Sequence, residues 1–370
     1  MRKKAYFKSV TIFLSILLVF SQLQLFSLPA YGETVSDQPL LFRSVGVAQN
    51  GTTYYVDGEG GNNANDGQSP ASAWRDFEKV NQTEFQPGDH LLLNAQSTWN
   101  NQLLHPKGNG TAAQKIVIDF YDTNDKGETI FETTRRPIIN GGGTYSTGTF
   151  KRAISGAVQL VNQEYWDISN LEVTNTPELD NLEGYKKPGD AQRAGILVLG
   201  YEQNRTFNSV TIRNNYVHDV QTEYYLNLSG NTATKRLKAV GGIIVLGSWF
   251  DENGNVVTAA NDHRTTTGFN DILIENNVIQ RVGLEGIRTK ADSDTSRGNT
   301  FYKTFSNITI RNNYLEDIAG DGIVLSESKS GGVVEGNVAV RMCNADYGTQ
   351  NYAGVWAMSV DDGLFQYNEV

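Results

Sequence analysis

Two carboxylates at equivalent positions of consecutive repeats are the first candidates for acid/base chemistry. Glu285 and Asp321 each precede a short Gly-Ile run, at residues 286–289 and 322–325. If these runs are neighbouring parallel strands, the carboxylates lie one strand spacing apart, ~4.8 Å. Carboxyl groups roughly 5–5.5 Å apart can hydrolyse a glycosidic bond with retention of configuration, and a wider pair suits inversion. The alternative is that each carboxylate caps backbone N–H groups at a turn.

Further candidates lie close by in the sequence. Asp361 and Asp362 form a second acidic pair, again with a turn as the alternative. Glu327 and Asp346 are expected at the rim of the same surface and could bind a substrate. Trp356, in a later Gly-led run, could stack on a sugar ring or pack beneath a loop.

Two cations support a different chemistry. Ile287 and Thr289 are expected to face the core, so Arg288 and Lys290 should point outward. A polysaccharide lyase needs a base to remove the proton beside a uronate carboxylate and cations to stabilise the enolate. Arg288 or Lys290 could supply the cation, or both could be ordinary surface residues.

Metal-binding signals are weak. His218 is expected at the surface after an Asn turn, and His263 lies in a loop; neither has partners at metal-ligand spacing. The loop 57–67, rich in Asn, Asp and Gly, could bind Ca²⁺ through oxygen ligands, although it lacks the ordered acidic spacing of an EF-hand. We therefore expect no metal site and no required cofactor, and keep Ca²⁺ as an option.

Repeated strands must position these residues. A strand, an Asn turn and a second strand recur at 166–173, 210–217, 272–279 and 308–315, with weaker copies at 333–338 and 364–370. Between them, Gly followed by alternating apolar residues occurs at 195–198, 242–245, 286–289, 322–325 and 354–357. Alternation in such short runs indicates strands, and each coil can bury its inward residues only by stacking on its neighbours.

The Asn turns predict the register of the stack. Asn adopts left-handed backbone angles readily, and its amide can bond to an identical neighbour. Asn at one corner of every coil should therefore form a ladder. The lower Gly-led strands are apolar outside as well as inside and should be covered by loops 176–193 and 222–239, which leaves a cleft around 285–362. The predicted fold is all-β, a right-handed parallel β-helix of about six coils with an N-terminal cap.

Composition divides the 370 residues into four parts. Residues 1–32 read as a signal peptide, with a basic start, an apolar run at 10–20 and an Ala30-Tyr31-Gly32 cleavage site. The alternative is an uncleaved membrane anchor, but the apolar run is shorter than the ~20 residues that a membrane span needs. Residues 33–52 are expected to be a linker, 53–152 the cap and first strands, and 153–370 the β-helix repeats.

Charge and cysteine content limit the partners and the location. The formal net charge is −10, and removal of the basic signal peptide makes it more negative, so nucleic acid is not an expected partner. No later segment is expected to enter a membrane. Cys343 is the single cysteine, expected in the core, and excludes an internal disulfide. We predict a secreted or cell-surface protein and leave its oligomeric state open.

The Asn-turn and Gly-Ile units resemble the repeat of the pectin-lyase-like β-helix superfamily over about 153–370. That group includes pectate lyases, polygalacturonases, alginate lyases and glycosidases, so the resemblance implies the fold more than the activity. The N-terminal part is similar to the cap of secreted bacterial β-helix proteins that act on polysaccharides, through Tyr54-Tyr55-Val56-Asp57, Asn65-Asp66-Gly67, Ala73-Trp74 and Pro87-Gly88-Asp89.

Residues 353–370 resemble a stretch of β-helix glycosidases of the α-L-fucosidase/xylanase type. In that group, the following coils carry further acidic residues and Asn turns. Because the sequence stops at Val370 within a coil, we expect the repeats, and part of the active site, to continue beyond it.

Three functions follow as hypotheses. The first is a glycoside hydrolase that acts on a polysaccharide or oligosaccharide through paired carboxylates. The second is a pectate-like polysaccharide lyase that uses Arg288 or Lys290 with calcium, and the third is a non-catalytic carbohydrate-binding solenoid of the cell surface.

Overall fold

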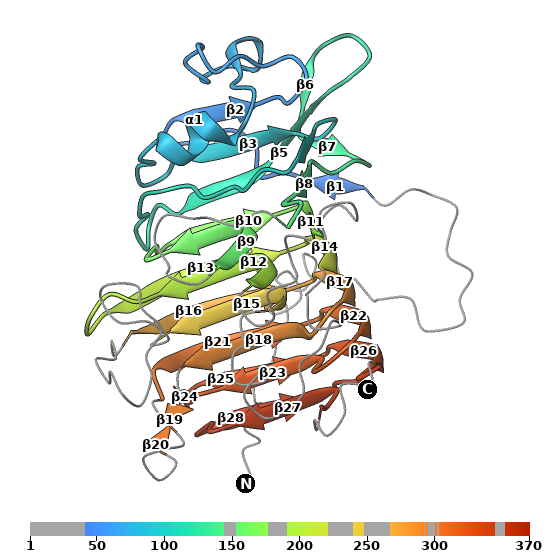
Figure 1. Cartoon of the computed structure of the whole chain (residues 1–370). Helices are drawn as coiled ribbons and strands as arrows, with labels where there is room; N and C mark the ends of the chain where they lie inside the picture. Colours follow the sequence, from blue (N-terminus) through green and yellow to red (C-terminus); the bar gives the residue numbers. More distant parts are fainter. Residues whose placement is uncertain are drawn as a thin grey trace, which may run out of the picture. The chain divides into compact units, whose positions relative to one another are not determined.

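The computed structural model describes residues 41–143, 153–176, 191–220, 240–247, 267–291, 293–294, 300–301, 303–344 and 352–370. All of them belong to the compact unit Leu41–Val370. Its described residues form three parallel sheets whose strands stack coil upon coil (Figure 1). The unit is therefore a parallel β-helix, which confirms the predicted fold class.

Each sheet takes successive strands from successive coils. Sheet 1 has the order β2 (Thr53–Val56), β3 (His90–Asn94), β5 (Ile116–Thr123), β10 (Trp166–Ser169), β13 (Thr206–Arg213), β16 (Gly268–Glu275), β21 (Phe305–Arg311), β25 (Gly332–Glu335) and β28 (Gly363–Gln366), with β6 (Thr129–Ile130) and β24 (Ser328–Ser330) at its side. Sheet 2 has the order β26 (Val338–Met342), β22 (Tyr314–Ile318), β17 (Val278–Val282), β14 (Tyr216–Val220), β11 (Glu172–Asn175), β8 (Ile138–Asn140) and β4 (Thr98–Asn100).

Sheet 3 carries the Gly-led strands. Its six strands are β27 (Val355–Met358), β23 (Ile323–Ser326), β18 (Glu285–Ala291), β15 (Gly241–Gly247), β12 (Ala191–Gly200) and β9 (Ala153–Val161). Two small antiparallel pairs lie outside the three sheets: β1 (Phe42–Arg43) with β7 (Glu132–Thr133), and β19 (Ser293–Asp294) with β20 (Thr300–Phe301).

The corner between sheets 1 and 2 is fixed by the predicted ladder of Asn amides. Side-chain bonds of 2.9–3.1 Å join successive members of the series Asn215, Asn277, Asn313, Asn337 and Asn368. The residue before each ladder Asn has the left-handed backbone, with φ of 54–63° at Asn214, Asn276, Asn312, Gly336 and Tyr367. The left-handed backbone and the amide that forms the ladder, both expected of one Asn, thus belong to two adjacent residues. Each buried amide bond contributes about 1 kcal/mol.

The core between the sheets is built from columns of like residues. Phe207, Phe269 and Phe305 stack with ring centroids 5.6 and 6.2 Å apart. Inward residues of sheet 3, including Ile287 and Ile323, belong to the same buried cluster. The columns form because parallel register places equivalent residues ~4.8 Å apart.

The outward face of sheet 3 changes chemistry along its length. Its central column runs Leu197, Ile244, Arg288, Val324 and Trp356, in the predicted register. Leu197 and Ile244 belong to a separate buried apolar cluster outside the core. The loops expected to cover them, 176–193 and 222–239, lie almost entirely outside the described residues.

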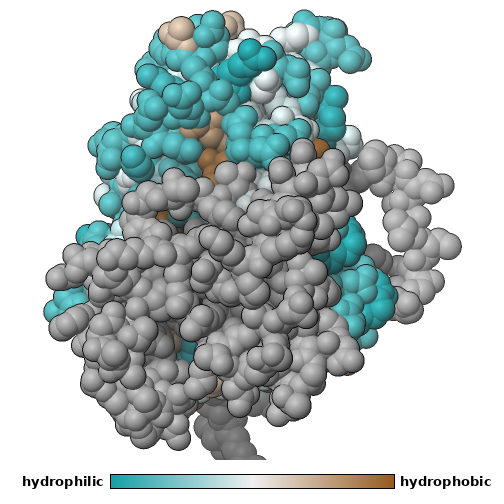
Figure 2. Space-filling model, in the orientation of Figure 1, coloured by the Kyte–Doolittle hydropathy of each residue, from teal (hydrophilic) through white to brown (hydrophobic). Residues whose placement is uncertain are grey.

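The N-terminal region continues the same stack. β5 pairs with β10 in parallel, and β3 and β2 follow it toward the end of sheet 1. A short helix, α1 (Phe77–Gln82), begins after the N-cap Asp76 and buries Phe77 and Val80 against this end, and a 3₁₀ turn, Pro70–Ser72, precedes it. The coloured surface of this end is mainly hydrophilic (Figure 2).

Two expectations differ from the structure. Residues 41–52, expected to belong to a linker, contact the cap: Phe42 and Arg43 pair with β7, and Val45 N donates to Asp119. Cys343 was expected in the core, but it is exposed, because it follows β26 at a corner with a φ of 57°. Among the described residues, no helix has the length and hydrophobicity to cross a membrane; residues 1–32 lie outside them.

Candidate active site

A buried cluster of two carboxylates and one guanidinium lies on the outward face of sheet 3. Arg288 Nη1 donates to Glu285 Oε1 at 2.7 Å and to Asp321 Oδ2 at 3.4 Å. The three side chains are at most 1% exposed. The structure therefore brings together the two carboxylates that sequence spacing predicted as a pair, with Arg288 between them.

The local sequence explains this convergence. Alternation places Ile287 in the core and Arg288 outside it. Gly286 and Gly322 follow the two carboxylates, and a Cβ at Gly286 would clash with the carbonyl oxygen of Gly322. The backbones can therefore approach closely at this corner. Asp321 Oδ1 also accepts from Ala353 N at 2.8 Å, but this N–H lies 32 residues further along the chain and does not belong to the local turn expected as the alternative.

A second buried ion pair follows at the other end of β18. Lys290 Nζ donates to Glu327 Oε1 at 2.7 Å, and Ala291 N donates to Glu327 Oε2 at 3.1 Å. Glu327 is fully buried, so its expected position at the rim of a cleft is wrong. The left-handed backbone at Glu327, with φ of 52°, follows the end of β23 and allows this contact.

The remaining candidates are distributed over the last coil. Trp356 lies beside Val324 in the outward column and is partly buried; among the described residues its Nε1 has no hydrogen-bond partner. Asp361 and Asp362 are exposed after the end of β27, and Asp361 pairs with Lys303. Asp321 precedes β23, whereas Asp361 follows β27, the next strand of sheet 3. Asp361 and Asp362 therefore lie beyond the opposite strand ends from Glu285 and Asp321. Asp346 lies outside the described residues.

The pKa of Cys343 depends on the charges of the buried cluster, although the sequence predicted only a structural role for this residue. Although Cys343 is exposed as a residue, partial burial of its thiol raises the thiol pKa first, and the charges of Asp321 and Glu285 raise it further. The single thiol of the chain therefore lies within the electric field of the two carboxylates. No sequence signal indicated this, because Cys343 lies 22 positions after Asp321 and directly follows a different strand, β26.

The outward face of sheet 2 carries a second charged region, which the sequence analysis missed. His218 contacts Glu172 Oε1 at 3.1 Å through Nε2 and Asp219 Oδ2 at 2.5 Å through Nδ1. Arg281 pairs with Asp219 at 2.8 Å and donates to the hydroxyl of Tyr216 at 3.2 Å. These side chains are partly exposed. The expected surface position of His218 is therefore correct, but its network was not anticipated.

The proposed calcium loop uses its carboxylates internally. Asp57 Oδ1 accepts from the N–H groups of Glu59 and Gly60, and Asp66 Oδ1 accepts from Gln68 N and Ser72 Oγ. These bonds lower the pKa of Asp66 below its usual value. Among the described residues, no group of three His, Cys, Asp or Glu side chains could hold a metal ion. Calcium binding stays a prediction.

Comparisons with known proteins support the same architecture. No protein-family model matches the chain. The lacto-N-biosidase of Bifidobacterium longum subsp. longum is 28% identical over 373 aligned residues, which cover 88% of this chain and 22% of that protein. Two crystal structures of the GH136 lacto-N-biosidase from Eubacterium ramulus, native and selenomethionine-labelled, are 23% and 24% identical with TM-scores of 0.62 and 0.61.

The matched region is a part of each of these relatives. The alignments with the two solved chains cover 86% of this chain and 51% of each of theirs. This chain thus spans about a fifth of the curated relative and about half of the solved ones. Likeness at this level shows a shared parallel β-helix fold. The resemblance to glycosidases of the α-L-fucosidase/xylanase type stays a prediction.

Proposed function

We propose that the protein is a secreted glycoside hydrolase that acts on an oligosaccharide at the Glu285–Arg288–Asp321 cluster. The single observation that carries the proposal is the convergence of two carboxylates on one guanidinium, at the junction of two coils. Likeness to a lacto-N-biosidase along 88% of the chain supports the same class of reaction. Secretion rests on the signal-peptide pattern of residues 1–32.

The geometry suggests different roles for the two carboxylates. Arg288 lies closer to Glu285, at 2.7 Å, so we assign Glu285 the role of the ionised group that attacks the anomeric carbon or activates water. Asp321 Oδ2 is further from the guanidinium, at 3.4 Å, and takes the role of the acid that protonates the leaving oxygen. Trp356, in the same outward column as Arg288, would support a sugar ring.

One observation favours a second candidate, a non-catalytic glycan-binding solenoid. Glu285, Arg288 and Asp321 are buried and pair with one another, which is also what a structural ion network does. In this case the cluster would hold adjacent coils together, and sugars would bind elsewhere.

Product analysis separates these candidates. The full chain is incubated with a panel of oligosaccharides that includes lacto-N-biosyl-bearing and uronate-bearing members. Hydrolysis predicts fragments whose summed mass exceeds that of the substrate by one water and that have no near-ultraviolet absorbance. An unsaturated, absorbing product would show a lyase instead. Binding without any turnover would overturn the proposed reaction in favour of the binding solenoid.

A further inference from the structure

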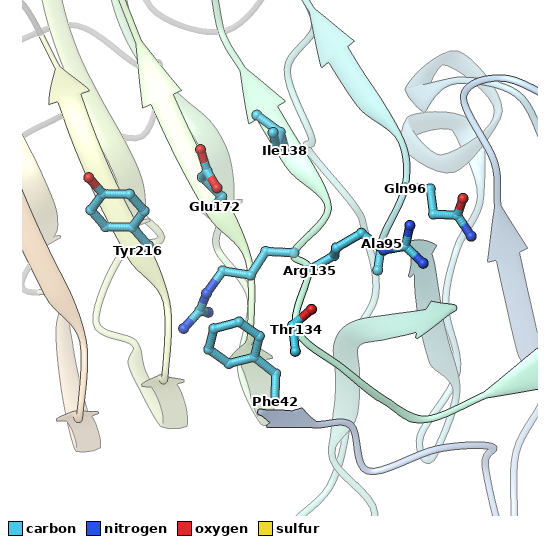
Figure 3. A pocket seen from close by; sticks show the side chains of 9 residues that line it. Phe42, Ala95, Gln96, Thr134, Arg135, Ile138, Glu172 and Tyr216 are labelled. Atoms are coloured by element: carbon cyan, nitrogen blue, oxygen red, sulfur yellow. The ribbon is translucent and has the colours of Figure 1, made fainter. Parts of the chain in front are cut away.

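A separate open pocket lies over the outward face of sheet 2, near the N-terminal end of the stack. Its volume is about 580 Å³, within the usual range of small-molecule sites. The floor is a row on adjacent strands, Ile138, Glu172 and Tyr216, which parallel register aligns (Figure 3). Phe42 from β1 forms one side, and Arg135 extends toward Gln96 on the other.

The two aromatic rings of the pocket are held in place by stacking partners. Tyr216 stacks on His218 with ring centroids 4.0 Å apart, and its hydroxyl donates to Gln280 at 2.9 Å. The guanidinium of Arg136 lies 3.8 Å from the centre of the Phe42 ring. Rigid rings lose little conformational entropy when a ligand binds.

Polar groups along the same walls remain available. Among the described residues, Glu172 Oε2 and Gln96 Oε1 have no hydrogen-bond partner, since Glu172 uses Oε1 for His218 and Gln96 donates through Nε2 to Asp122 and Thr123. Arg136 donates through Nη1 to the carbonyl of Asn214, which leaves its other N–H groups without a partner in the described part. Acceptors and donors therefore flank the aromatic rings.

We propose that this pocket is a second saccharide-binding site, distinct from the cluster on sheet 3. The rings of Phe42 and Tyr216 can pack against the apolar faces of a pyranose. The polar groups beside them can donate to and accept from its hydroxyl groups. Both guanidinium and carboxylate groups line the pocket, which suits a neutral sugar better than a charged one. The choice of a saccharide rests partly on the proposed function, because the lining alone fits other polyhydroxylated ligands.

The pocket would bind one part of a long glycan on sheet 2, while another part of the same glycan would contact the cluster on sheet 3. The strand spacing of ~4.8 Å in the floor allows neighbouring sugar units to contact neighbouring strands. Such a site increases the effective concentration of a long substrate at the cluster without any new contact there.

The test is a binding titration on a glycan array with the full chain carrying Asp321→Asn, which removes the proposed acid but keeps the ion pair of Arg288 with Glu285. Tyr216→Ala is expected to weaken the neutral glycan that binds tightest by about tenfold, and Tyr216→Phe, which keeps the ring, should retain most of the binding. The matched control is Tyr314→Ala, because Tyr314 lies two coils further along the same column and outside the pocket.

Each outcome decides the proposal separately from the catalytic one. Loss in Tyr216→Ala with retention in Tyr216→Phe and Tyr314→Ala supports the site, even if the unmodified protein hydrolyses nothing. Unchanged binding in Tyr216→Ala, equal losses in both alanine variants, preference for uronate-bearing glycans, or no glycan binding at all would overturn it. A failure to hydrolyse that leaves these results unchanged counts only against the cluster on sheet 3.

Discussion

The outward faces of sheets 2 and 3 carry the same kinds of charged residue in different surroundings. On sheet 3, Glu285 and Asp321 meet Arg288 where all three are nearly inaccessible to solvent. On sheet 2, Asp219 pairs with Arg281 at a comparable distance of 2.8 Å, but both side chains are more than 40% exposed. Because the pairing distances are similar, we expect burial to decide how much each ion pair contributes to stability, with a larger effect on sheet 3 than on sheet 2.

The most disruptive substitution should be Arg288→Met. It leaves two buried carboxylates without their common partner, which costs about 3–5 kcal/mol of unfolding free energy. Urea unfolding followed by tryptophan fluorescence measures the difference. A loss below ~1 kcal/mol would show that water reaches the cluster and would contradict its burial.

The matched substitution on sheet 2 is Arg281→Met. It removes a guanidinium of similar pairing geometry from a solvated site, so the expected loss is about 1 kcal/mol or less. The same urea titration applies, repeated at high salt, where the remaining difference should shrink. Equal losses for the two variants would contradict the contrast between the sheets.

The field of the buried carboxylates can be measured through Cys343. The charges of Asp321 and Glu285 help to raise the pKa of its thiol, so Asp321→Asn should lower that pKa and increase the thiolate fraction. Alkylation by iodoacetamide near pH 8 is then expected to be roughly twofold faster. Glu335→Gln, on sheet 1, serves as the control and should leave the rate unchanged.

The smallest effect is expected from the titration of His218 on sheet 2. Burial alone would lower the pKa of His218, but the hydrogen bonds to Glu172 and Asp219 outweigh it and raise the pKa. This stability is fully present below the unfolded value of ~6.5 and is lost as the pH rises through the raised folded value. The unfolding temperature of the parent should therefore exceed that of His218→Gln by about 1 °C at pH 5.5 and by less at pH 8.5. A difference that grows with pH would contradict the assignment.

Periodic features of the fold were predictable from the sequence, and irregular ones were not. The Asn ladder and the outward column of Arg288 follow from repeat spacing, since parallel register transmits one position to the next coil. The pairing of Glu285 with Asp321 follows in the same way. Burial of Glu327 could not be predicted, because it depends on one left-handed residue after β23.

Contacts made by segments without the repeat pattern could not be predicted from the sequence either. Phe42 lies 94 residues before Arg136, yet the two side chains stack beside the pocket of sheet 2. Its segment carries no periodic signal, and antiparallel pairing of β1 with β7 brings it to that surface. Cys343 was expected in the core because it ends an apolar stretch that begins at Val338, but the strand ends at Met342.

Catalysis by the cluster on sheet 3 is tested by the turnover numbers of the single variants Glu285→Gln and Asp321→Asn on the oligosaccharide that the unmodified protein hydrolyses fastest. Each change keeps the shape of the side chain and removes its acid/base function, so we expect losses of about 10²–10⁴-fold. Glu275→Gln, at the partly exposed pair with Arg311 on sheet 1, should keep full activity. Full activity in either cluster variant, with unfolding temperatures unchanged, would contradict the assignment of catalysis to sheet 3.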